Sequence, residues 1–294
     1  MHTDVIIIGG SYAGLSAALP LARARRQVTV VDAGRRRNRF ASHSHGFLGR
    51  DGHAPAAIAE EAKRQLLAYP TVRWIEGEAT QATPNAQGFD VVVNDQTLSA
   101  SRLVLAGGVV DQLPEVQGLS ERWGRSVFHC PYCHGYELNQ GAIGVLATSE
   151  LAMHHAQLLP EWGAVTLLLN GAFAPDDAQN QMLERCGVQV ESSRVLRLVD
   201  HANAVLEDGR TLHFSGIFTM PNTRMASELP HQLGCALEQG PVGSYLKVNP
   251  LMETSVPGVF ACGDTARGFG NVAMAVGDGA MAGASVHRSL VFDH

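Results

Sequence analysis

The chain has 294 residues, of which 45% are hydrophobic and 17% charged, and its formal net charge is −6. This is a globular composition without the basic excess that nucleic-acid binding requires, so no nucleic-acid partner is expected. The length allows two domains of ordinary size.

The apolar run from Val5 to Ile8 is short and follows Asp4 without a basic leader. It therefore predicts neither a signal peptide nor a membrane span. The five cysteines are an odd and sparse set, which indicates no framework of structural disulfides. We expect a cytoplasmic protein that does not bind membranes.

Residues 5–32 have the pattern of a strand, a glycine turn, a helix and a second strand. The apolar run at 5–8 predicts a buried parallel strand, the stretch that follows the Gly9–Gly14 turn up to Arg26 predicts a helix, and residues 28–31 predict a second strand that ends in Asp32. A glycine turn with an acidic residue about twenty positions later places a pyrophosphate on a helix N-terminus and a ribose hydroxyl on a carboxylate. Ser11 stands at the middle glycine position of this turn, and its side chain leaves less room for the backbone to approach the ligand.

The same pattern returns between Gly141 and Leu169, with strands expected at 142–146 and 165–169 and a helix between them. Ala147 and Ser149 stand where glycines would approach a dinucleotide. The second strand ends in Asn170-Gly171, which offers neither an acid for a ribose nor an arginine for a 2′-phosphate. The fold element is expected here without its ligand chemistry.

Near the C-terminus, residues 256–264 predict a turn and a short strand that ends in Gly263-Asp264, followed by a helix of small residues from about 271 to 287. A carboxylate at such a strand end can accept hydrogen bonds from a polyol such as the ribityl chain of a flavin. We therefore predict an α/β fold with two Rossmann-like, doubly wound, three-layer domains. Residues 1–112 and 245–294 form the first, and residues 113–244 form the inserted second domain.

The segment His129-Cys130-Pro131-Tyr132-Cys133-His134 holds a Cys-x-x-Cys pair, which can exchange between dithiol and disulfide. A c-type haem attachment site would need an exported chain, and a structural zinc site would need a second pair of ligands. Two inert core cysteines would leave the neighbouring flavin motifs unexplained. Redox chemistry is favoured over these three alternatives, and no metal is predicted.

Together, four motifs resemble the low-molecular-weight thioredoxin reductase family: the turn Gly9–Gly14 with Asp32, Leu105-Ala106-Gly107-Gly108, the Cys pair, and Gly263-Asp264. The resemblance covers nearly the whole chain. It implies a homodimer with an FAD-binding domain and an inserted NADPH-binding domain that carries the redox disulfide.

Two departures from that family bear on function. His134 replaces the aspartate that commonly follows the second cysteine, and the inserted domain lacks the glycines and arginines that hold NADPH. Residues 129–137 and 44–49 look like a subgroup that contains the flavin-dependent dithiol oxidases of gliotoxin- and holomycin-type natural products. The resemblance thus implies FAD, whereas the NADPH-binding motifs are degenerate.

By this resemblance Cys133 faces the flavin and Cys130 exchanges with substrate. His134, an imidazole beside two sulfurs with an unperturbed pKa close to neutrality, is placed to move protons, and Glu137 is a carboxylate that could orient it. The other positions carried over from the family would bind the cofactor. They are Gly9, Gly10, Ser11, Ala13, Gly14, Asp32, Ala33, Arg39, His45, Ala79, Gly107, Gly263, Asp264, Asn271, Val272 and Ala273.

The leading functional hypothesis is FAD-dependent oxidation of a dithiol, on a small molecule or a protein, with oxygen or another acceptor. The alternative is a reductase of a thioredoxin-like protein that takes electrons from NADPH or another donor. A third hypothesis is a flavin-bound redox sensor that signals through the Cys pair without turnover.

Overall fold

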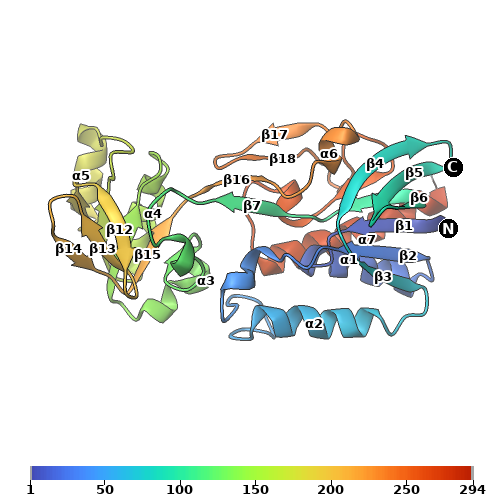
Figure 1. Ribbon diagram of the computed structural model, residues 1–294, viewed down its shortest axis with the longest axis horizontal. Coiled ribbons are helices and arrows are strands. Elements are labelled where there is room, and N and C mark those ends of the chain that lie inside the picture. The colour runs from blue at the N-terminus through green and yellow to red at the C-terminus, as the bar shows by residue number, and fades with distance from the viewer. Residues whose placement is uncertain (1, 293–294) are drawn as a thin grey trace. The chain divides into compact units, whose positions relative to one another are not determined.

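The computed structural model describes residues 2–292, and Figure 1 shows its helices and strands. The chain divides into two compact units. The first unit runs from the N-terminus to Arg37, continues from Pro55 to Val110, and takes up the chain again from Thr223 onward. The second unit comprises Asn38–Ala54 and Asp111–Asn222.

The first unit is built on a mixed seven-stranded sheet. Six of its strands follow the order β3-β2-β1-β6-β5-β4, and the seventh, β19, pairs with β6. The parallel strands are β1 (His2–Ile8), β2 (Val28–Asp32), β3 (Val72–Glu76), β6 (Gln96–Leu105) and β19 (Val259–Ala261). Strands β4 (Ala79–Asn85) and β5 (Gly88–Val93) are antiparallel. Val5, Ile6 and Ile7 are completely buried, as expected for a central strand covered on both faces.

The helices of this unit are α1 (Tyr12–Arg23), α2 (Pro55–Leu66), α6 (Leu229–Gln232) and α7 (Val272–Phe292), with 3-10 turns η1 (Arg37–Phe40) and η5 (Gly263–Ala266). Helices α1 and α7 pack closely along small residues. A Cβ at Gly279 would lie 2.2 Å from the carbonyl oxygen of Ala13, and one at Gly283 would lie 2.2 Å from that of Ala17. This contact fixes the position of α1, whose first turn follows the glycine loop.

The second unit contains a parallel five-stranded sheet with the order β11-β10-β9-β15-β8. Its strands are β8 (Val127–Phe128), β9 (Ala142–Leu146), β10 (Ala164–Leu168), β11 (Gln189–Glu191) and β15 (Gly216–Thr219). An antiparallel sheet of β12 (Val195–Val199), β13 (Asn203–Leu206) and β14 (Thr211–His213) accompanies it. The helices are α3 (Pro131–His134), α4 (Ala152–Leu158) and α5 (Asp177–Arg185), with 3-10 turns η2 (Ser120–Arg122), η3 (Tyr136–Leu138) and η4 (Leu159–Glu161).

The predicted fold class is confirmed: the chain is α/β, and each unit carries the parallel strands of a nucleotide-binding fold. The predicted strands at 5–8, 28–31 and 142–146 coincide with β1, β2 and β9. Helix α1 ends at Arg23, three residues before the expected end, and α7 continues past residue 287 to Phe292.

The predicted domain boundary near residue 244 is wrong, because the chain returns to the first unit between Asn222 and Thr223. Residues after 223 contribute Leu229, Leu233 and Leu246 to the hydrophobic core of the first unit. The strands β17 (Leu237–Gln239) and β18 (Ser244–Leu246) form a hairpin within it. Burial of each such leucine stabilises the first unit by roughly 1.5–3 kcal/mol, which outweighs any local preference for a boundary near residue 244.

Residues 38–54 form a second difference, since they belong to the second unit although the sequence pattern places them in the first. The backbone of Ser44 pairs with that of His53 and closes the segment into a loop. Gly124 lies so near Phe40 that a Cβ would come within 2.8 Å of the phenylalanine. Strands β7 (Val109–Gln112) and β16 (Asn222–Met225) pair with each other where the chain passes between the units.

Among the residues described, none of the helices combines the length and the apolar character that a bilayer crossing would need.

Candidate active site

The turn between β1 and α1 has no room for side chains at its glycines. Gly9 has φ +104°, and a Cβ there would lie 2.3 Å from the carbonyl oxygen of Ala106. A Cβ at Gly14 would lie 1.8 Å from the carbonyl oxygen of Gly9. Ser11 precedes α1 as its N-cap residue, and its side chain makes no capping hydrogen bond. The helix N-terminus is therefore not capped by protein, which suits an anionic ligand.

Asp32 closes the same turn from the end of β2. The backbone N–H of Gly10 donates a hydrogen bond to Asp32 Oδ1 over 3.1 Å. A carboxylate has further acceptor positions, so Asp32 can also accept hydrogen bonds from a ribose. Ribose binding by Asp32 stays a prediction.

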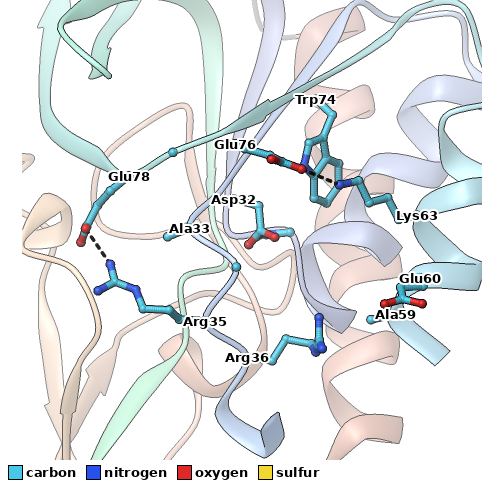
Figure 2. Close-up of a pocket in the computed structure, with 13 residues that line it drawn as sticks. Asp32, Ala33, Arg35, Arg36, Ala59, Glu60, Lys63, Trp74, Glu76 and Glu78 are labelled. Carbon is cyan, nitrogen blue, oxygen red and sulfur yellow. Dashed lines mark hydrogen bonds and ion pairs between the residues drawn. The ribbon is translucent and has the colours of Figure 1, made fainter. Parts of the chain in front are cut away.

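A cavity of about 660 Å³ opens beside Asp32, and Figure 2 shows its lining. Gly10, Asp32 and Ala33 lie on it together, as predicted. The structure adds further side chains to this lining. Arg35 and Arg36 come shortly after Asp32 in the sequence, whereas the others belong to α2, β3 and the residues just after β3, which the motif does not indicate. These others are Ala59, Glu60, Lys63, Trp74, Glu76 and Glu78.

Trp74 is the most informative of these residues. The Lys63 ammonium lies 4.2 Å from the centre of its ring, and the ring also lies against Gly10, where a Cβ would come within 2.3 Å of it. Its indole Nε1 is buried and has no hydrogen-bond partner in the structure. Trp74 lines the cavity together with Arg35 and Arg36, and an aromatic ring beside cationic side chains fits a ligand with a planar base and phosphates, such as the adenosine end of FAD.

The remaining predicted cofactor residues are more dispersed. Asp264 forms an ion pair with Arg37 over 2.9 Å, and Gly263 lies against Ala13, with a Cβ at Gly263 placed 2.8 Å from the Ala13 Cβ. Asn271 caps α7, since its side chain accepts a hydrogen bond from Met274 N–H over 2.9 Å, and Val272 and Ala273 open that helix.

Three other predicted residues have clear local roles. Ala79 is buried in the hydrophobic core of the first unit, and the Arg39 guanidinium lies 4.2 Å from the centre of the Phe40 ring in the second. Gly107 has open space where a Cβ would stand. Contact of Ala79, Arg39 and Gly107 with a cofactor stays a prediction.

Cys130 and Cys133 form a disulfide, with Cα atoms 5.3 Å apart. Pro131 starts the single turn of α3 between them, and Tyr132 is exposed. The Tyr132 ring meets Trp162 edge-on, with ring centres 5.4 Å apart. The Cys pair is thus held on a short turn braced by an aromatic contact.

His134 follows Cys133 and packs on the core of the second unit. Its ring stacks on Phe128 with centres 4.2 Å apart. Burial, together with smaller effects of the neighbouring His129 and His45, lowers the pKa of His134 to about 4. This differs from the near-neutral pKa expected from the sequence. At neutral pH the imidazole is uncharged, and it is a weaker base than a free histidine.

The carboxylate expected to orient His134 has a different partner. Glu137 Oε1 lies 3.4 Å from Nε2 of His45, whose Nδ1 lies 3.7 Å from Asp51 Oδ1. Two carboxylates therefore flank one imidazole of the loop 38–54. The pairing of His45 with Glu137 could not be predicted from local sequence, because it joins two segments that are distant along the chain. The contribution of His45 to flavin binding stays a prediction.

His45 and His134 line the same cavity of the second unit, which has a volume of about 570 Å³. We call it the histidine cavity. Phe128, Leu138 and Phe214 form apolar parts of its wall, and its polar lining comes from several segments of this unit. The polar residues are Ser42, His43, His45, Arg125, His134, Glu137, His201 and Ser215.

The turn between β9 and α4 differs from the glycine turn of the first unit. Thr148 Oγ1 donates a hydrogen bond to the carbonyl of Met220 over 2.8 Å, and Ser149 Oγ accepts one from Leu151 N–H over 3.3 Å. The Glu150 carboxylate lies at the same turn and accepts a hydrogen bond from Gln179. The protein's own side chains satisfy this turn, and a pyrophosphate would meet a carboxylate there.

The structure nevertheless brings a cation to the end of β10. The Arg194 guanidinium lies 3.1–3.3 Å from where a Cβ of Gly171 would stand. This arginine comes from the start of the segment that leads into β12, so the residues at the strand end did not reveal it.

Within residues 2–292, no three or more His, Cys, Asp or Glu side chains are grouped so as to hold a metal ion.

An α/β chain with a glycine-turn dinucleotide cradle in one unit and a Cys-x-x-Cys disulfide in the other defines a nucleotide-dependent disulfide oxidoreductase. The family model for pyridine nucleotide-disulphide oxidoreductases matches residues 3–279, so the chain belongs to that family. Membership implies a flavin, usually together with NADPH.

Two relatives are similar to this chain over nearly its full length. It is 32% identical to thioredoxin reductase tcpT of Claviceps purpurea, covering 99% of this chain and 95% of that one. It is 31% identical to thioredoxin reductase sirT of Leptosphaeria maculans, covering 97% and 93%.

Two solved structures are also similar. An oxidoreductase from Agrobacterium tumefaciens is 55% identical with a TM-score of 0.97 and full coverage of both chains. The structure of HlmI is 36% identical with a TM-score of 0.92, covering 99% of this chain and 93% of that one.

Proposed function

We propose that the protein oxidises a substrate dithiol to a disulfide, using the Cys130–Cys133 disulfide and FAD, with oxygen or another compound as the final electron acceptor. The observation that carries this proposal is the contrast between the two turns. The turn of the first unit is uncapped and lies beside a cavity, whereas that of the second is closed by its own Thr148 and Ser149. This contrast favours a flavin site without an equally good nicotinamide site.

The residues present fit FAD. Asp32 would hold the adenosine ribose, and the Gly9–Gly14 turn with the start of α1 would hold the pyrophosphate. Trp74 lines the cavity beside Asp32, where the adenosine would lie. Bound FAD supplies an acceptor for the two electrons that leave the Cys pair.

The chain's own groups account for the exchange steps. A substrate thiol gives its proton to His134, which is neutral at pH 7, and the thiolate attacks Cys130 Sγ. The Cys130–Cys133 bond breaks and Cys133 leaves as a thiolate. The second substrate thiol loses its proton and attacks the mixed disulfide, which releases the disulfide product and the Cys130 thiolate. The substrate loses two electrons and two protons, and the Cys pair gains the two electrons.

A second candidate is an NADPH-driven reductase of a thioredoxin-like protein, and Arg194 is the observation that favours it. A guanidinium beside the end of β10 is suited to a 2′-phosphate. In either case a homodimer is proposed on the family resemblance, and a cytoplasmic location stays a prediction.

Anaerobic mixing separates the two candidates. The purified holoenzyme is mixed with dithiothreitol, NADPH and NADH in turn, and the oxidised-flavin band at about 450 nm is followed. Fast bleaching by dithiothreitol with slow or no bleaching by the nicotinamides is the expected result. Fast bleaching by NADPH would instead establish the reductase, and a spectral change without turnover of dithiol in air would indicate the sensor.

A further inference from the structure

His45 is held in one position by its surroundings. Its ring lies between Glu137 Oε1 at 3.4 Å and Asp51 Oδ1 at 3.7 Å, and its side chain is 21% exposed. Asp51 Oδ1 is itself fixed, because it accepts a hydrogen bond from Gly46 N–H over 2.8 Å. The backbone pairing of Ser44 with His53 closes the loop around this group.

The two carboxylates leave both ring nitrogens of His45 beside an acceptor. Nε2 faces Glu137 and Nδ1 faces Asp51, so an N–H on either nitrogen of this ring points toward a carboxylate oxygen. His45 and His134 line the same cavity. The titratable and charged groups that face His45 are Asp51 and His43 from its own loop, His134 and Glu137 from the segment after Cys133, and Arg125 and His201 across the cavity.

The proposed reaction needs such a group. Oxidation of one dithiol releases two protons, whereas a single neutral imidazole at the Cys pair can take up one. After His134 has accepted the proton of the first thiol, it must lose that proton before it can serve the second. A second acceptor on the same cavity removes this block.

We propose that His45 is the second proton acceptor of dithiol oxidation, taking the proton from the His134 side of the histidine cavity and passing it to water beside Glu137. This inference rests on the proposed function. No bond to carbon or sulfur changes in this step: one N–H bond forms on His45 as the proton leaves His134.

The test measures anaerobic flavin bleaching by dithiothreitol in a stopped-flow instrument, with wild-type holoenzyme, His45→Ala and the control His53→Ala. His53 lies in the same loop, is exposed, and is not on the cavity. We expect His45→Ala to bleach at least about tenfold more slowly at pH 7. This is less than the roughly 10²–10⁴-fold typical of a general acid or base, because His134 still accepts the first proton. His53→Ala should bleach at the wild-type rate.

Two readouts distinguish proton transfer from a structural role. The deficit of His45→Ala should shrink above about pH 8.5, where thiols ionise without a base. Added imidazole should restore much of the lost rate at pH 7. Glu137→Gln, which keeps the His45 ring but replaces one of its two flanking carboxylates by an amide, should lie between the wild type and His45→Ala. Flavin absorbance relative to protein is measured in every variant, so that rates are compared per bound flavin.

The opposite results are equally clear. A His45→Ala enzyme that matches the wild type at all pH values, or one whose deficit is independent of pH and unaffected by imidazole, would overturn the role of His45 alone. Wild-type enzyme that dithiothreitol fails to bleach would instead overturn the proposed function.

Discussion

At the scale of single residues, the Cys pair shows how position decides reactivity. Cys130 and Cys133 are bonded and half-buried, whereas Cys235 and Cys262 are free and buried. Burial raises the pKa of the Cys235 and Cys262 thiols, and the nearby Asp278 adds to this for Cys262. A thiol with a raised pKa is a poor nucleophile at neutral pH, so the exchange chemistry belongs to the Cys pair.

Single-cysteine variants should separate the two roles in the pair. In Cys133→Ser the Cys130 thiol lacks a resolving sulfur, so its reaction with an aromatic disulfide such as dithionitrobenzoate should stop at a stable mixed disulfide. We expect Cys133→Ser to react faster than Cys130→Ser, and both to lose bleaching by dithiothreitol. Intact-protein mass spectrometry locates the adduct. Faster reaction of Cys130→Ser would reverse the assignment of the exchanging sulfur.

His155 is a buried titratable residue outside the proposed chemistry. It is 2% exposed, and burial lowers its pKa to about 4, with smaller effects from His154 and His129. A hydrogen bond with the His129 backbone opposes this shift, and the ring meets Phe218 edge-on. His155 thus supports the segment that leads into the Cys pair.

This burial predicts a pH dependence of stability. Because the folded pKa lies below that of the unfolded chain, the unfolded state binds more protons between about pH 4 and 6.5, and stability falls as the pH drops through that range. His155 should account for a loss of about 2 kcal/mol between pH 7 and pH 5. Urea unfolding of His155→Leu at the two pH values should show a correspondingly smaller loss. The exposed His154→Gln serves as the control, and an unchanged loss in His155→Leu would contradict this account.

At the scale of elements, α1 and α7 depend on glycine for their contact. A methyl group at Gly279 would overlap the Ala13 carbonyl, whereas Gly277, one half-turn earlier on α7, has open space at its Cβ. The same helix therefore contains a crowded and an uncrowded glycine.

Alanine substitutions at these two glycines should have opposite effects. Gly279→Ala should destabilise the protein by about 1–3 kcal/mol and lower its flavin content, because α1 is displaced from the glycine turn. Gly277→Ala should be neutral or stabilise by up to about 1 kcal/mol, since alanine favours a helix interior. Thermal unfolding and the ratio of flavin to protein absorbance check both. Equal behaviour of the two variants would refute the close-packing argument.

The turn between β9 and α4 supports a further prediction. Restoring glycine in Ala147→Gly/Ser149→Gly should not create tight NADPH binding, because Thr148 still ties the turn to Met220 and Glu150 remains at the start of α4. NADPH titration followed by nicotinamide fluorescence should give no micromolar affinity. If such affinity does emerge, its loss on Arg194→Ala would identify the guanidinium responsible.

At the scale of the whole molecule, local patterns predicted the parts whose structure depends on local sequence. The strands β1, β2 and β9 follow from short apolar runs, and the glycine turn with Asp32 follows from the steric demands of a close backbone approach. The loop 38–54 and the return at Thr223 could not be predicted in this way. Their assignment depends on contacts between distant segments, such as Phe40 with Gly124 and Leu229 with the core of the first unit.

The two units have separate hydrophobic cores, which predicts stepwise unfolding. Calorimetry of the apoprotein should show two transitions. Added FAD should stabilise the first unit most, by about 4 kcal/mol at a thousandfold excess over its Kd, because the glycine turn and the cavity beside Asp32 lie in that unit. A single transition that shifts as a whole would argue against independent units.

Because residues 38–54 belong to the second unit, a chimera with a relative should exchange them together with residues 111–222. A chimera that exchanges only residues 111–222 would keep the native His45 and place a foreign residue opposite it at position 137. Exchange of both segments together would keep the imidazole and its carboxylate as a matched pair. The His45–Glu137 pair is therefore encoded by two separated segments, and recombination at one junction between them would separate the imidazole from its carboxylate.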